Sequence, residues 1–175
     1  AAGSLLTDNL KTIALSTDKA KTSAFAKKLC KRYIPKGIGI GYEWERFLEG
    51  ITPQGIVSFS DTVLSSCQNT VIIEDAFGSV SNIIMNRIRE YALSNGYDII
   101  SIKNALLPLT LLDGVIIPEL SLCFIRESGS FKINSPIRRI HARRFISDKA
   151  LSRKRLKFNK KAIASLLSSA PKTLR

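Results

Sequence analysis

The sequence predicts an α/β domain in which helices flank a parallel sheet, and three neighbouring segments carry this prediction. Residues 70–74 form a β-branched, almost fully apolar run, which is typical of a strand covered on both faces. Residues 79–95 place their apolar side chains on one face at helical spacing, and residues 97–102 have the pattern of the next strand. A strand, a helix and a strand at this spacing form a βαβ unit, whose strands run parallel. The length of 175 residues fits one such domain.

Two helices are expected before this unit. Residues 4–33 are helical in pattern, and the Ser-Thr-Asp at 16–18 divides them because these side chains cap a new helix start. Pro35 ends the second helix. Three glycines at alternate positions over 37–41 then form a G-x-G-x-G run after a helix, which we interpret as a flexible connector.

The other expected elements are shorter or lie nearer the C-terminus. In chain order they are a strand over 55–59, a weak helix over 60–67, strands over 114–117 and 121–125, and a basic helix over 148–170. We therefore divide the chain into three parts. Residues 1–45 are an N-terminal helical segment with its connector, 46–130 are the α/β core, and 131–175 are a basic C-terminal helical segment that packs on this core.

The charge of the chain is strongly asymmetric. The formal net charge is +13, from 27 Lys and Arg side chains against 14 Asp and Glu. Residues 1–125 carry 12 basic and 12 acidic side chains, whereas residues 126–175 carry 15 basic and 2 acidic ones, which is the whole excess. The sequence therefore indicates a neutral body with a basic C-terminal segment.

The apolar content indicates a protein with a real core and no membrane span. The chain is 45% hydrophobic, but no apolar run approaches the roughly 18–20 residues that a membrane helix needs. No secretory signal is visible at the N-terminus. Cys30, Cys67 and Cys123 are odd in number and widely spaced, so we expect reduced, buried thiols and a cytoplasmic protein.

The turn after the central strand, residues 75–82, stands where P-loop NTPases carry the sequence G-x-x-x-x-G-K-[ST]. In that loop the backbone N–H groups cradle phosphates, the lysine reaches the outer phosphates and the hydroxyl binds magnesium. Here Asp75 and Val80 replace the two glycines, Ser81 replaces the lysine and Asn82 replaces the hydroxyl residue. Gly78 and Ser79 are the other loop residues that could contribute to an anion site. Without a lysine, the loop lacks the positive charge that ATP phosphates require.

Longer stretches resemble a bacterial family of ATPase-like proteins that carry two P-loop NTPase domains in tandem. The stretch from Arg46 to Phe59 contains the Arg-Phe-x-x-x-x-Thr-Pro-x-Gly pattern of that family, and the strand–loop–helix follows it. The segment from Val115 to Leu122 resembles its Val-Ile-Pro-Glu-Leu motif. The resemblance covers about residues 46–125 with the motifs in order, and thins toward both ends.

This resemblance implies one half of such a protein, with a three-layer P-loop NTPase-like fold and a degenerate Walker A loop. The strand over 121–125 is followed by Arg126, where a Walker B strand would offer an aspartate. Both departures favour a non-hydrolysing structural or regulatory module. No cofactor is then expected, ATP and magnesium included, and the implied partner is a sister NTPase-like domain or a second copy of the chain.

Two other functions stay open from the residues themselves. The first is an enzyme: Glu74 and Asp75 at a strand end, with Asp113 and Glu119 beside another strand, suggest metal-dependent or acid–base chemistry. A nucleotide- or phosphate-binding enzyme with an atypical loop is a weaker form of this alternative. A catalytic triad would have to use His141, which lies among arginines.

The second alternative is a nucleic-acid-binding protein that uses its basic C-terminal helix. Phosphate contacts by lysine and arginine give such binding a steep salt dependence. Docking on an acidic sister domain, or on an anionic membrane surface, would use the same cations. The proposed partner surface comprises Arg138, Arg139, Arg143, Arg144, Arg153, Lys154, Arg155, Lys157, Lys160 and Lys161.

Overall fold

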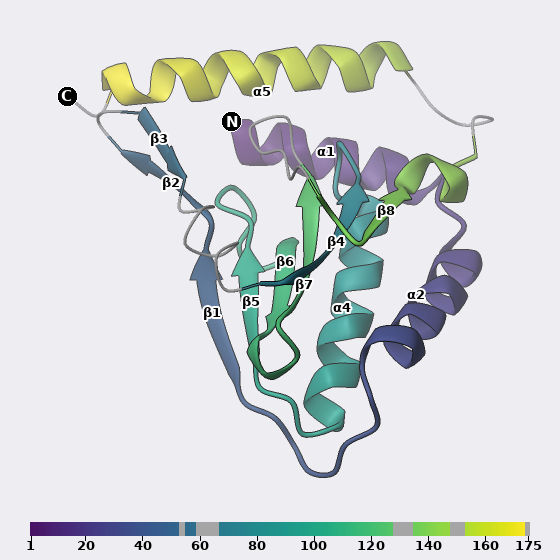
Figure 1. Cartoon of the computed structure of the whole chain (residues 1–175). Helices are drawn as coiled ribbons and strands as arrows, with labels where there is room; N and C mark the ends of the chain where they lie inside the picture. The colour runs from purple at the N-terminus through teal and green to yellow at the C-terminus, as the bar shows by residue number, and fades with distance from the viewer. Residues whose placement is uncertain (53–54, 59–66, 128–134, 148–152, 174–175) are drawn as a thin grey trace.

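The computed structural model describes residues 1–52, 55–58, 67–127, 135–147 and 153–173. It is an α/β structure with a mixed, mostly parallel six-stranded sheet and four helices (Figure 1). The helices are α1 (Ala2–Ala14), α2 (Lys19–Tyr33), α4 (Ser79–Ser94) and α5 (Arg153–Thr173). The strands are β1 (Glu43–Phe47), β2 (Glu49–Thr52), β3 (Gly55–Ser58), β4 (Asn69–Glu74), β5 (Ile99–Lys103), β6 (Leu112–Ile117), β7 (Leu122–Glu127) and β8 (Arg138–His141). Short 3-10 turns η1 (Pro118–Leu120) and η2 (Ala142–Phe145) follow β6 and β8.

The central βαβ prediction is confirmed at the level of its elements. The strand β4, the helix α4 and the strand β5 occupy the expected segments, and all of Val71–Ile73 is buried. The division of the N-terminal helices is also confirmed, because the Asp18 side chain accepts a hydrogen bond from the Lys21 N–H at 2.9 Å and caps α2. The short strand expected at 55–59 is present as β3, which pairs with β2 in a separate hairpin.

The expectation of a wholly parallel sheet is wrong for one strand. The strand order is β1-β5-β6-β7-β4-β8, and β6 runs antiparallel to both of its neighbours. The three-residue turn η1 joins β6 to β7, and so short a connection allows only an antiparallel pair. Its end at Ser121 has φ of 47°, a left-handed conformation that closes the turn.

Two edge strands, β1 and β8, were not expected from the sequence. Four of the five residues of β1 are exposed, and only Ile140 of β8 is buried. Each strand pairs with the sheet along one side, β1 with β5 and β8 with β4. Segments with so little buried surface lack the apolar alternation from which a strand is predicted.

The main core lies between one face of the sheet and the helices α2 and α4. Fully buried side chains such as Leu29, Ile88 and Phe124 meet there. A second, smaller cluster on the opposite face includes Leu48 and Ile116, and no helical residue belongs to it in the described part of the chain. The weak helix expected over 60–67 falls mainly on residues 59–66, outside the described residues.

The expectation of three reduced cysteines is wrong for two of them. Cys67 and Cys123 form a disulfide with a Cα–Cα distance of 5.9 Å, which is the usual spacing for such a bond. Cys30 is a free, buried thiol, as expected. Burial raises the pKa of the Cys30 thiol to about 11, so that this group stays protonated at neutral pH.

The basic helix is present as α5, which ends at Thr173, later than expected, and the expected start over residues 148–152 lies outside the described residues. It lies along α1, whose C-terminal end approaches the turn between β4 and α4 (Figure 1). Leu156 is buried at this contact, whereas Leu166 further along α5 is 38% exposed. No helix in the described residues has both the length and the apolar character to cross a membrane.

Candidate functional site

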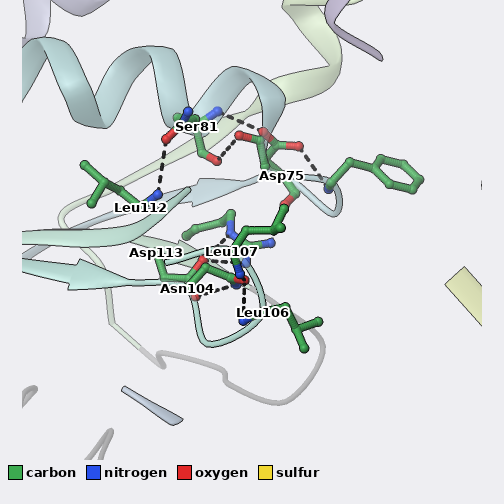
Figure 2. A network of polar contacts seen from close by, with 11 residues as sticks. Asp75, Ser81, Asn104, Leu106, Leu107, Leu112 and Asp113 are labelled. Carbon is green, nitrogen blue, oxygen red and sulfur yellow. Dashed lines mark hydrogen bonds and ion pairs between the residues drawn. The ribbon is translucent and has the colours of Figure 1, made fainter. Parts of the chain in front are cut away.

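The turn between β4 and α4 is filled by one of its own side chains. The Asp75 carboxylate is 3% exposed and accepts hydrogen bonds from the backbone N–H groups of Val80 at 2.9 Å and Ser81 at 2.8 Å. It also accepts one from the Phe77 N–H at 3.2 Å. Figure 2 shows this carboxylate directed at the first turn of α4. The N–H groups that would hold an external anion at a helix start therefore already have an internal one.

Gly78 is the residue that permits this turn. Its φ of 87° is left-handed, and a Cβ atom there would lie 2.8 Å from Cδ1 of Leu111. Glycine alone adopts this conformation without strain and without that contact. Its carbonyl accepts a hydrogen bond from the Ser81 hydroxyl at 3.2 Å, and Ser79, the first residue of α4, is buried. Gly78 thus allows the tight turn in which the Asp75 carboxylate reaches the start of α4.

Asn82 fastens the turn to a neighbouring loop. Its side-chain oxygen accepts the Leu112 N–H at 3.1 Å, and its amide donates to the Thr110 carbonyl at 2.9 Å. The side chain that stands at the magnesium-binding position of a P-loop is therefore occupied in joining α4 to the start of β6. The residues expected in the loop all lie together at this turn; they are Asp75, Gly78, Ser79, Ser81 and Asn82.

An ion pair lies beside the turn. The Arg126 guanidinium, with its side chain 8% exposed, donates from Nε and Nη2 to Oδ1 of Asp113 at 2.9 and 2.5 Å. Its Nη1 is 3.4 Å from the Asp75 carbonyl oxygen, and Asn104 donates to Oδ2 of Asp113 at 2.9 Å (Figure 2). The arginine that stands at the Walker B position is therefore neutralised by Asp113 and held against the turn.

The other strand-end acid, Glu74, is also paired. It contacts His141 Nδ1, and it accepts a hydrogen bond from Arg139 at 3.0 Å. Arg139 donates to Glu127 as well, at 2.7 Å. Hydrogen bonding to Glu74 raises the pKa of the Arg139 guanidinium. Glu74 therefore serves to hold β8 to β4, and it is not directed at the Asp75 carboxylate in a shared site.

The acids do not form a metal centre in the part of the chain that the structure describes. No three His, Cys, Asp or Glu side chains come together there as a set of metal ligands. Glu119, the remaining candidate acid, is exposed on η1, between β6 and β7. A hollow of about 210 Å³ lies beside the turn, and it is closed on one side by Ile13 of α1 and Ala142 of η2.

The predicted basic surface divides into two groups. Arg138, Arg139, Arg143 and Arg144 lie on β8 and η2, and η2 contacts α2 and α4. Arg153, Lys154, Arg155, Lys157, Lys160 and Lys161 lie on α5, which contacts α1, β2 and β3. Two of these side chains form ion pairs with acids of the same chain, Arg139 with Glu74 and Arg155 with Asp8. The cations therefore do not form the single surface that their proximity in sequence indicates.

The structure adds a third basic element, which the sequence analysis missed. Helix α2 carries six basic side chains and no acidic one. The positive charge of this segment is visible in the sequence, but acidic residues elsewhere in 1–125 cancel it when the charge is summed over that range. A count over one predicted helix would have found it.

The comparisons with known proteins found no match for this chain among protein-family models, curated proteins or solved structures.

Proposed function

We propose that this chain is a P-loop NTPase-like domain whose degenerate loop binds no nucleotide, and that it acts as a structural or regulatory module; the third layer expected from the sequence is not seen among the described residues. Its partner in this proposal is a sister NTPase-like domain or a second copy of the chain. The resemblance over residues 46–125 is the origin of the proposal. The geometry of the β4–α4 turn is what supports its negative half, the lack of nucleotide binding.

The observation that carries the proposal is the position of the Asp75 carboxylate. It takes up the N–H groups of Val80 and Ser81, the donors that a P-loop would offer to phosphate. A nucleotide brought to this turn would have to displace a buried carboxylate of like charge. The turn has no lysine between residues 75 and 82 to offset that repulsion.

The ion pair of Arg126 and Asp113 supports the same proposal. Magnesium in a P-loop NTPase is held by a hydroxyl of the loop and an acid at the end of the neighbouring strand. At the end of β7 this chain has Arg126, whose donors are taken by Asp113. Arg126 offers no carboxylate to hold the metal ion, so hydrolysis would lack the magnesium that neutralises the phosphates as well as the phosphate cradle.

The test is a thermal shift with Mg-ATP. A ligand that binds only the folded state at 100 times its Kd stabilises the protein by about 2.7 kcal/mol, which a melting curve detects readily. We expect the melting temperature with millimolar Mg-ATP to equal that with magnesium chloride and an equal concentration of chloride salt. Stabilisation that saturates with ATP would overturn the proposal and favour the nucleotide-binding alternative.

The nucleic-acid alternative is favoured by one observation, the exposure of the α5 lysines. Lys157, Lys160 and Lys161 are all exposed, and no ion pair joins them to a carboxylate within the described residues. This alternative predicts that reversing these three charges abolishes nucleic-acid binding. Its test is therefore the variant Lys157→Glu, Lys160→Glu and Lys161→Glu.

A further inference from the structure

A groove with cationic walls runs between α2 and α4, which lie side by side on one face of the sheet (Figure 1). The hollow measures about 450 Å³. Its lining residues are Ala24, Lys27, Lys28 and Lys31 from α2, and Arg87 and Tyr91 from α4. It lies on the helical side of the domain, whereas the β4–α4 turn lies at the end of the sheet.

Helical spacing puts these side chains on facing surfaces. Positions 24, 27, 28 and 31 are separated by three or four residues, so that they form one face of α2. Arg87 and Tyr91 are four apart and form the opposing face of α4. The inner neighbours Leu29 and Ile88 are fully buried between the helices and fix the two faces against each other.

The charge of the groove is almost uncompensated. Lys27, Lys28 and Lys31 are exposed, and the described residues contain no ion pair between them and a carboxylate. Arg87 is 3.3 Å from Glu90, a pair in which both side chains are largely in solvent. Like charges at this spacing on a helix destabilise it, so α2 retains them at some expense to its own stability. A polyanionic ligand would remove that repulsion.

A second group of cations gathers around Phe25, another side chain of α2. The guanidinium groups of Arg138 and Arg144 lie 5.5 and 5.1 Å from the centre of the Phe25 ring. Lys21, four residues before Phe25, donates from Nζ to the Arg144 carbonyl at 3.0 Å. Stacking on a ring restrains an arginine while its N–H groups stay available in the plane of the guanidinium.

We propose that the α2–α4 groove binds single-stranded nucleic acid, with the phosphates on Lys27, Lys28 and Lys31 and a base against Tyr91. Single-strand sites combine a positive groove that follows the backbone with aromatic side chains on which bases stack. An acidic protein surface would use the same lysines, so competition with polyglutamate distinguishes the two partners. This proposal is independent of the β4–α4 turn, and the failure of either leaves the other standing.

The experiment is fluorescence anisotropy with the full chain and a labelled single strand of about 12 nucleotides. The groove variant carries Lys27→Glu, Lys28→Glu and Lys31→Glu, and the control carries Lys157→Glu, Lys160→Glu and Lys161→Glu, which changes the net charge equally. We expect the groove variant to bind at least roughly tenfold more weakly and to lower the slope of log K against log salt by about 2. If the groove is the site, the control binds within about threefold of the wild type, whereas the α5 alternative predicts that the control loses binding.

A second variant tests the aromatic contact without any change of charge. Tyr91→Leu should weaken binding by roughly fivefold or more, because stacking contributes about 1–3 kcal/mol per base. Circular dichroism and melting curves on each variant separate loss of binding from loss of folding. Ribose and deoxyribose strands of one sequence are compared, and binding of either supports the proposal.

Four results would overturn the proposal. These are no binding by the wild type, equal losses in the groove and α5 variants, full binding by Tyr91→Leu, and displacement of the strand by polyglutamate at equal charge concentration. Equal losses would mean that only net charge matters, and displacement by polyglutamate would indicate an acidic protein as the partner.

Discussion

The two ends of helix α4 have opposite electrostatic surroundings. At its N-terminus the Asp75 carboxylate accepts three backbone N–H groups, and Arg126 and Asp113 neutralise each other beside it. Further along, Arg87 and Tyr91 face lysines of α2 that have no carboxylate partner among the described residues. In the first region these charged groups are paired within the protein, whereas in the second the α2 lysines are exposed.

This difference between the β4–α4 turn and the groove indicates which of the two has free groups for a ligand. The β4–α4 turn is the site that the fold and the resemblance indicate, yet its donors are already occupied. The groove has no recognised motif, but its cations are available. The groove proposal therefore rests on unpaired charge between two packed helices, and not on position in the sheet.

The largest expected effect is on the buried ion pair. Arg126→Leu leaves Asp113 without its main partner, and removing one member of a buried pair costs about 3–5 kcal/mol. Because Asp113 is 21% exposed, we expect a loss near the lower end, measured as the free energy of unfolding in urea. The double variant with Asp113→Leu should recover much of it. A single variant within 1 kcal/mol of the wild type would contradict the role given to this pair.

A smaller loss is expected at the turn itself. Asp75→Ala leaves three N–H groups without their acceptor and should lower the free energy of unfolding by about 2 kcal/mol. Asp75→Asn, which keeps one acceptor oxygen, should lose less. Inorganic phosphate should raise the melting temperature of Asp75→Ala, because the vacated N–H groups become an anion site, and should leave the wild type unchanged. Equal responses to phosphate would show that the carboxylate is not what fills the turn.

The smallest expected effect is on the edge strand β1, and it depends on pH. Arg89 donates to Glu43 from Nε at 2.6 Å, and this hydrogen bond lowers the pKa of the Glu43 carboxyl below its ordinary value. The stabilisation is therefore present above the unfolded pKa of about 4.3 and is lost as the pH falls through the lower folded pKa. Glu43→Gln should destabilise the protein by roughly 1 kcal/mol at pH 7 and by much less at about pH 3. Glu90→Gln, in an exposed pair, is the control and should show little change at either pH.

Much of the fold could be predicted from the sequence because its central elements have strong local patterns. The apolar run of β4 and the helical periodicity of α4 each signal burial within a few residues. The edge strands β1 and β8 were missed because most of their side chains face solvent. The direction of β6 was missed although the sequence held the signal, because the strands expected over 114–117 and 121–125 are only three residues apart and so short a connection allows only an antiparallel pair.

The candidate site was predicted in its location but not in its contacts. The sequence identified residues 75–82 as a turn without the lysine of a P-loop, and it identified Arg126 as a departure. It could not show that Asp75 turns back onto the N–H groups of its own helix, or that Asp113 is the partner of Arg126. The disulfide between Cys67 and Cys123 spans 56 residues and was likewise beyond a local pattern.

By itself, then, the sequence determined which segments are buried, which are helical and what the β4–α4 turn lacks, because burial leaves a periodic trace over neighbouring residues. Only the tertiary structure decided which charges are neutralised and which remain available. Arg155 meets Asp8 across 147 residues, while the lysines of α2 meet an arginine and a tyrosine of α4. The partner of a charged side chain is set by which residues pack beside it, and these are often distant in sequence. A sum of charges along the chain therefore does not show which charges are paired.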